Sequence, residues 1–192
     1  MKKFLLLLPL ILPLGGCAAP LLIGAAATGG YFAAQDKGIE TAANDLKIKA
    51  LVKDKLAELD FTHVLSVGVF VLQGDVVLTG VVHSPREEKE LVHITEQVEG
   101  VHRVFDAFQV GVGYSTEQIA TDAWIATQVR ASMFTAKDVF TVNYDVEVVN
   151  GHVYIIGLAE TEIEFERVLH LARTTKGVVA VHPYIRVEEK TK

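Results

Sequence analysis

The strongest constraint in this sequence is an internal repeat. When the 192 residues are compared with themselves at a displacement of 77 positions, identical residues align without a gap. The matched residues of the first copy are Asp45, Ile48, Val52, Val69, Val71, Gly74, Val76, Gly80, Glu87, His93, Gly100, Val101, Val104 and Val110. A solenoid needs at least three copies, so this repeat predicts two tandem domains of one fold.

Each copy begins with a helix and a hairpin. Apolar residues lie four apart in the first helix, which is the spacing of a buried helical face; they are Ile48, Val52 and Leu56 in one copy and Ile125, Val129 and Met133 in the other. Two strands then meet at a tight turn. Asn150-Gly151 is a strong signal for such a turn, and Gln73-Gly74 is its weaker counterpart.

A second helix and a last strand complete each copy. Capping boxes open the helix, Ser84 with Glu87 and Thr161 with Glu164, and Gly100 and Gly177 suit its end. The last strands are predicted over 101–112 and 178–187. The order α-β-β-α-β predicts an α+β fold, an open-faced sandwich with helices on one side of a mixed sheet. We place the two domains at 44–113 and 116–188.

These residues carry a family resemblance. A glycine in the hairpin, a glycine ending the second strand (Gly80, Gly157) and Gly-Val-x-x-Val after the second helix, at 100–104 and 177–181, resemble the BON domain. Two such domains behind a lipoprotein signal are similar to the dual BON-domain outer-membrane lipoproteins. That resemblance implies a periplasm-facing protein that binds phospholipid and supports outer-membrane integrity.

The amino terminus has the pattern of a targeting signal. Lys2 and Lys3 precede an apolar run over 4–14, which is too short to span a bilayer and indicates a signal peptide over 1–16. Leu14-Gly15-Gly16-Cys17 resembles the bacterial lipobox, which implies acylation of Cys17; an uncleaved anchor or a free thiol is the alternative. Ala18 resembles an outer-membrane sorting signal. Residues 17–43 are expected to be the lipidated cysteine and a flexible tether.

Charge and motifs exclude several function classes. A net charge of −6 argues against nucleic acid as a partner. No nucleophile motif or phosphate-binding glycine loop occurs, so we expect no catalysis and no cofactor. None of the seven histidines is spaced for metal binding on a helix. His93 and His170 are predicted to be surface residues, and Glu160, Glu162, Glu164 and Glu166 a solvated helix start.

Trp124 is the candidate lipid contact. It lies about 100° around the helix from Ile125, and its counterpart in the first copy is Lys47, a residue that favours solvent. Indoles favour the membrane interface, and the resemblance associates phospholipid contact with this helix. The alternative is that Trp124 packs against the other domain or the linker.

Five neighbours complete the candidate site. Gln128 stands where family members often carry a lysine, which leaves Arg130 as the only cation in the helix and weakens the case for anionic lipid. Ile119, Met133 and Phe134 are candidate insertion residues, although we favour ordinary core for these three.

The open faces of the sheets must be covered. We expect Phe70, Leu72, Phe105 and Ala107 of the first copy, and Glu147, Val149, His182 and Tyr184 of the second, to face away from the helices. They are predicted to pack the two domains together or to bind a protein partner. The alternative function is therefore a periplasmic adaptor that binds envelope proteins through this face. The sequence does not define the oligomeric state.

Overall fold

The computed structural model describes residues 36–59, 66–111 and 115–188. The chain divides into two units, Met1–Glu40 and Thr41–Lys192, and the predicted domains 44–113 and 116–188 both fall in the second. The predicted signal peptide, Cys17 and the tether as far as residue 35 lie outside the described residues. Residues 36–43 were expected to belong to the tether, but they form the first two turns of a helix. Glu40, Ala42 and Ala43 in this segment have high helix propensity, which favours the longer helix.

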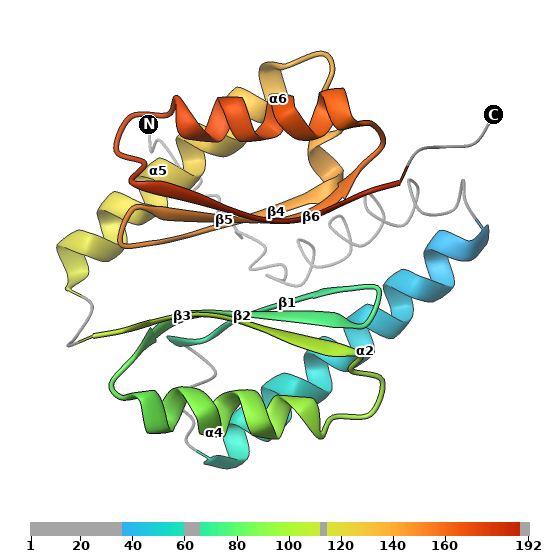
Figure 1. Ribbon diagram of the computed structural model, residues 1–192, viewed down its shortest axis with the longest axis vertical. Coiled ribbons are helices and arrows are strands. Elements are labelled where there is room, and N and C mark those ends of the chain that lie inside the picture. The colour runs from blue at the N-terminus through green and yellow to red at the C-terminus, as the bar shows by residue number, and fades with distance from the viewer. Residues whose placement is uncertain (1–35, 60–65, 112–114, 189–192) are drawn as a thin grey trace, which may run out of the picture. The chain divides into compact units, whose positions relative to one another are not determined.

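The first domain has the predicted order of elements. It comprises α2 (Asp36–Leu59), β1 (Gly68–Leu72), β2 (Asp75–Val82), α4 (Pro85–Glu96) and β3 (Arg103–Val110). β1 pairs with β2 in antiparallel fashion, and β2 pairs with β3 in parallel. The sheet is therefore mixed, and α2 and α4 cover one of its faces (Figure 1).

The second domain repeats this architecture. It comprises α5 (Thr116–Thr135), a short 3₁₀ turn η1 (Thr141–Asn143), β4 (Tyr144–Val149), β5 (His152–Ala159), α6 (Glu162–Arg173) and β6 (Ala180–Val187). Its sheet has the order β4-β5-β6 with the same mixed pairing. The prediction of two α-β-β-α-β sandwiches is confirmed. The last strands start two residues later than predicted, because His102 and Val179 instead donate backbone hydrogen bonds to Gly74 and Gly151 of the hairpins.

Local sequence signals account for the turns and helix ends. Gln73 and Asn150 adopt positive φ, as do the glycines that follow them, so both hairpins use the predicted two-residue turn. Ser84 and Thr161 accept hydrogen bonds from the backbone of Glu87 and Glu164, as capping boxes require.

The carboxylate of Glu164 differs from its predicted solvated state. Its side chain is 3% exposed. It accepts hydrogen bonds from the backbone N–H groups of Phe140 and Glu160, both at 2.8 Å. Glu164 therefore ties the loop before η1 to the start of α6, and the prediction of a solvated residue was wrong for it.

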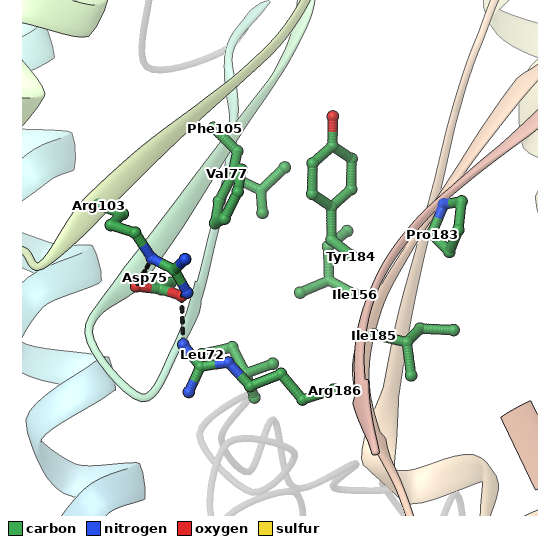
Figure 2. A pocket seen from close by; sticks show the side chains of 10 residues that line it. All are labelled: Leu72, Asp75, Val77, Arg103, Phe105, Ile156, Pro183, Tyr184, Ile185 and Arg186. Atoms are coloured by element: carbon green, nitrogen blue, oxygen red, sulfur yellow. Dashed lines mark hydrogen bonds and ion pairs between the residues drawn. The ribbon is translucent and has the colours of Figure 1, made fainter. Parts of the chain in front are cut away.

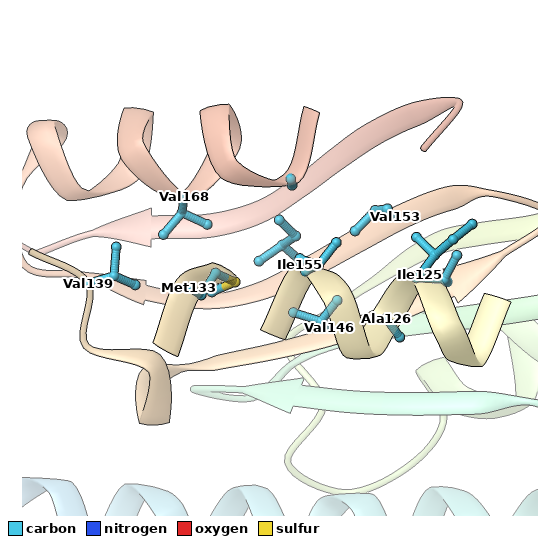
Figure 3. Packing of buried hydrophobic residues seen from close by; sticks show 11 residues of the cluster. Ile125, Ala126, Met133, Val139, Val146, Val153, Ile155 and Val168 are labelled. Carbon is cyan, nitrogen blue, oxygen red and sulfur yellow. The ribbon is translucent and has the colours of Figure 1, made fainter. Parts of the chain in front are cut away.

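The predicted helical stripes form the two cores. Ile48, Val52 and Leu56 are buried in the first domain. Figure 3 shows the equivalent packing in the second, where α5 and α6 cover the sheet; the cluster includes Ile125, Val129, Met133, Val146, Ile155 and Val168.

Candidate membrane-contact face of the second domain

Helix α5 is held firmly on its domain. Ser115 caps its start by accepting a hydrogen bond from Gln118 N. Asp122, which is 3% exposed, accepts hydrogen bonds from Asn150 N at 2.6 Å and Gly151 N at 2.9 Å. One face of the helix is thus fixed to the core and to the hairpin, which defines the face that remains outside.

The outer face of α5 exposes the only tryptophan of the chain. Trp124 is 48% exposed. Its exposed neighbours within two turns on this face, Ala120, Thr127, Gln128 and Ala131, are small or uncharged. Of the charged residues of α5, Asp122 is buried and Arg130 donates a hydrogen bond to the carbonyl of Val146 on β4. The remaining one, Glu117, lies in the first turn.

The equivalent face of α2 is charged. Lys47, Asp54 and Glu58 stand there, and all three are exposed. At a displacement of 77 residues, they correspond to Trp124, Ala131 and Thr135 of α5. Because the two helices have the same place in their folds, this difference is not required by packing. The exposed face of α2 therefore serves as a comparison for the exposed face of α5.

The other predicted site residues divide between surface and core. Ile119 is 49% and Phe134 80% exposed, so the favoured expectation of core was wrong for these two. Ile119 lies near the start of α5 and Phe134 near its end. Met133 is fully buried in the core, which removes it from any lipid-contact surface. Gln128 and Arg130 are exposed residues of the helix.

Sequence reasoning missed three exposed apolar residues beyond the end of α5. They are Phe140, Val142 and Ile163. An ion pair between Asp138 and Arg167 and the bond from Phe140 N to Glu164 hold this loop against α6. Ile163 could have been found by the argument used for Trp124, because its counterpart in the first domain is the exposed Arg86.

The open faces of the two sheets cover each other. A shared cluster of buried residues comprises Val77, Ala107, Val149, Tyr154 and Ile156, with Phe70, Leu72, Val81, Phe105 and Tyr184 packed against it. Phe105 meets Tyr184 edge to face at a centroid distance of 5.5 Å. The predicted packing between domains is confirmed. The sheet face proposed for a protein adaptor is occupied by the sister domain in this arrangement.

A cavity of about 210 Å³ opens at one rim of this interface. Figure 2 shows Asp75 between Arg103 of its own domain and Arg186 of the second. Burial alone would raise the pKa of the Asp75 carboxyl, but hydrogen bonds and charge from the two guanidinium groups outweigh it and hold that pKa below its usual value. The Asp75 carboxylate balances the charge of one of the two arginines and is bonded to both of them. Because Arg186 belongs to the second domain, this cluster, which we call the Asp75 clamp, joins the two domains.

The described part of the chain offers neither a cluster of three or more metal ligands nor a membrane-spanning helix. Within it, no group of three or more His, Cys, Asp or Glu side chains is placed to hold a metal ion. No helix among residues 36–59, 66–111 and 115–188 combines the length and hydrophobicity needed to cross a bilayer. His93 and His170 are exposed on their helices, as predicted.

Two α-β-β-α-β domains packed sheet against sheet define a tandem-domain protein of the α+β class. The chain belongs to the BON-domain family, whose model matches residues 44–112 and 121–189. It is similar to the outer membrane lipoprotein DolP of Haemophilus influenzae, with 26% identity over 94% of this chain and 93% of the relative. It is also similar to an uncharacterized protein from the gshII 5′ region of Anaplasma centrale, with 32% identity over 64% and 82% of the two chains.

A third relative is a 21 kDa hemolysin of Actinobacillus pleuropneumoniae, which is 23% identical over 58% of this chain and 57% of the relative.

Proposed function

We propose that this protein is an acylated lipoprotein of the outer membrane that faces the periplasm, binds phospholipid through α5 and supports envelope integrity without catalysis. One observation carries the lipid contact. The exposed Trp124 lies on a face of α5 where small and uncharged residues replace the three charges of the equivalent face of α2. An indole on such a face suits the interface between headgroups and acyl chains.

The anchor and this contact act together in the proposed mechanism. Acylation of Cys17 confines the protein to the membrane, which gives α5 a high effective concentration of lipid. A weak contact then suffices to orient the second domain on the bilayer. The similarity to DolP, itself an outer membrane lipoprotein, supports this location. The net charge of −6 favours insertion of apolar side chains over attraction of anionic headgroups.

Tryptophan fluorescence tests the contact, because Trp124 is the only tryptophan. A protein beginning at residue 18 is mixed with zwitterionic or anionic vesicles. The emission should start red and shift to the blue when the indole enters the interface. Emission that is not moved by either vesicle would contradict the lipid contact.

A matched pair of variants separates this contact from unspecific charge effects. Trp124→Glu should weaken vesicle binding at least tenfold, because a carboxylate must be desolvated at the interface. Lys47→Glu places the same side chain at the equivalent position of α2 and should have little effect. Equal losses in a flotation assay would place the contact elsewhere.

The anchor has its own test. Palmitate labelling of the full chain in a Gram-negative host should depend on Cys17, so that Cys17→Ala abolishes both the label and recovery in the outer-membrane fraction. Cells that lack the protein should become sensitive to detergent, and wild type but not Trp124→Glu should restore resistance.

A further inference from the structure

Two histidines from neighbouring strands meet on the sheet of the second domain. His152 is the first residue of β5, and His182 of β6 stands opposite Tyr154, two residues further along β5. Side chains two residues apart on a strand share a face of the sheet. Nδ1 of His152 lies 3.0 Å from Nε2 of His182, and the rings are inclined by only 11°.

These two nitrogens are directed at each other. A neutral imidazole has one N–H donor and one acceptor nitrogen, so this contact is made by one proton and one lone pair. When that proton moves to the other nitrogen of the donor ring, both rings stay neutral and two lone pairs face the same space. Bonds from a transition-metal ion to imidazole nitrogen measure about 2.0–2.1 Å, so two of them span up to about 4 Å. Two such bonds at about a right angle join nitrogens about 3 Å apart, so an ion can bind both once each ring turns its lone pair toward the ion.

We propose that His152 and His182 form a two-histidine site for a divalent transition-metal ion that binds Cu²⁺ more tightly than Zn²⁺, with water in the remaining positions. Imidazole nitrogen suits both ions, and Cu²⁺ stands above Zn²⁺ in the general order of affinities. The absence of a third protein ligand among the described residues makes this an open site of modest affinity.

The surroundings of the pair support metal binding. Tyr154 stacks on His182 with ring centroids 4.9 Å apart, and Gln109 donates a hydrogen bond to the hydroxyl of Tyr154. These contacts restrict the His182 ring, as outer partners do in metal sites.

The site is confined to the second domain. The positions equivalent to His152 and His182 in the first domain are Asp75 and Phe105. Asp75 is engaged by two arginines there. The positions that hold two imidazoles in one copy thus hold a carboxylate and a phenyl ring in the other.

Metal titration of the untagged full chain in detergent micelles tests the proposal. Calorimetry with Zn²⁺ is compared for wild type, His152→Ala, His182→Ala and the control His170→Ala, whose ring is exposed on α6. His152→Ala and His182→Ala should each lower the Zn²⁺ affinity at least tenfold, and His170→Ala should leave the affinity unchanged. Binding at Cys17 or the amino terminus is common to all four proteins and cancels in the comparison.

Electron paramagnetic resonance with Cu²⁺ supplies an independent readout. Wild type should show coupling to two imidazole nitrogens, and either alanine variant should lose it. Unfolding in the presence of a chelator identifies any variant that fails to fold, and His152→Gln, which keeps a polar side chain, then replaces His152→Ala. Wild-type affinity in the folded His152 variant, or an equal loss in His170→Ala, would overturn the proposal.

Discussion

Gln109 and Arg186 hold equivalent positions on the last strands of the two domains, and each reaches the hairpin of the other domain. Gln109 donates to the carbonyl of Val149 at 2.9 Å and accepts from the side chain of Asn150 at 2.8 Å. Arg186 donates to the side-chain oxygen of Gln73, which occupies the turn position equivalent to Asn150. The interface therefore has approximate twofold symmetry, as in an isologous dimer.

The two rims of this interface differ in charge. One rim is neutral and is bonded through Gln109. The other contains the Asp75 carboxylate with Arg103 and Arg186. Because Asp75 is 5% exposed, it depends on these partners for the solvation that it loses on folding. The rim that contains Asp75 should therefore lose stability when acid protonates this carboxylate.

Asp75→Asn is expected to lower the free energy of unfolding by about 2 kcal/mol at pH 7, because hydrogen bonds to charged groups are replaced by weaker ones. The folded-state pKa of Asp75 is depressed, so its contribution is present above pH about 4 and is lost as the pH falls through that lower pKa. Urea unfolding of both proteins from pH 7 to 3 should show the difference shrinking. The exposed Asp54→Asn is the control; a constant difference at all pH values would contradict the clamp.

Local signals made most of the fold predictable. The stripe in each first helix, the hairpin residues and the capping hydroxyls act within a few residues of chain, and the repeat displays each of them twice. The exposure of Trp124 followed from comparing it with Lys47. Such comparisons succeed because equivalent positions in the two copies have the same backbone environment.

Contacts between distant residues were not predictable in the same way. Arg186 and Asp75 are 111 residues apart, and their pairing depends on how two sheets are placed face to face. The meeting of His152 with His182 depends on strand register. A search for metal ligands along helices does not detect it. The helical residues 36–43 were missed because the longer stretch 18–43 is mostly small residues, which suggested a linker, although alanine also favours helix.

Asp122→Ala should destabilise the protein more than Asp45→Ala. Both carboxylates accept two hydrogen bonds from the hairpin backbone of their own domain. Asp122 is buried, whereas Asp45 is half-buried, so water can replace the lost acceptor at Asp45. We expect losses of about 3 and about 1 kcal/mol, in the range for unsatisfied buried donors. Equal losses in urea denaturation would show that burial does not control the cost.

Gly157→Ala should be strongly destabilising. A Cβ atom at this position would lie 2.1 Å from the carbonyl oxygen of Asn143, and at Gly80 it would lie 2.6 Å from that of Ser66. Ser66 and Asn143 are themselves equivalent. In both domains the glycine, which has no Cβ, therefore leaves room for the segment that leads into the first strand. We expect a loss of about 3 kcal/mol for Gly157→Ala, as for overpacking. At the control position Gly111, the nearest atom to an added Cβ is 3.8 Å away, so Gly111→Ala should change stability by less than about 0.5 kcal/mol. Thermal unfolding of both variants and of wild type measures these differences.

Gln128→Lys should convert an insertion contact into one that selects anionic lipid. Gln128 is exposed about 40° around α5 from Trp124, so a lysine there would reach the headgroups when the indole is inserted. A lysine near an anionic surface contributes about 1 kcal/mol, which corresponds to about a fivefold gain in affinity.

Flotation with the two kinds of vesicle measures this effect. The gain should appear only with anionic vesicles and should fall as salt is added, because salt screens exposed charges. Gln97→Lys adds the same charge at the end of α4 in the first domain, far along the chain from Trp124, and is the matched control. If Gln97→Lys produces the same gain, then net charge rather than the face of α5 controls binding, and the orientation of the second domain on the membrane is not the one proposed.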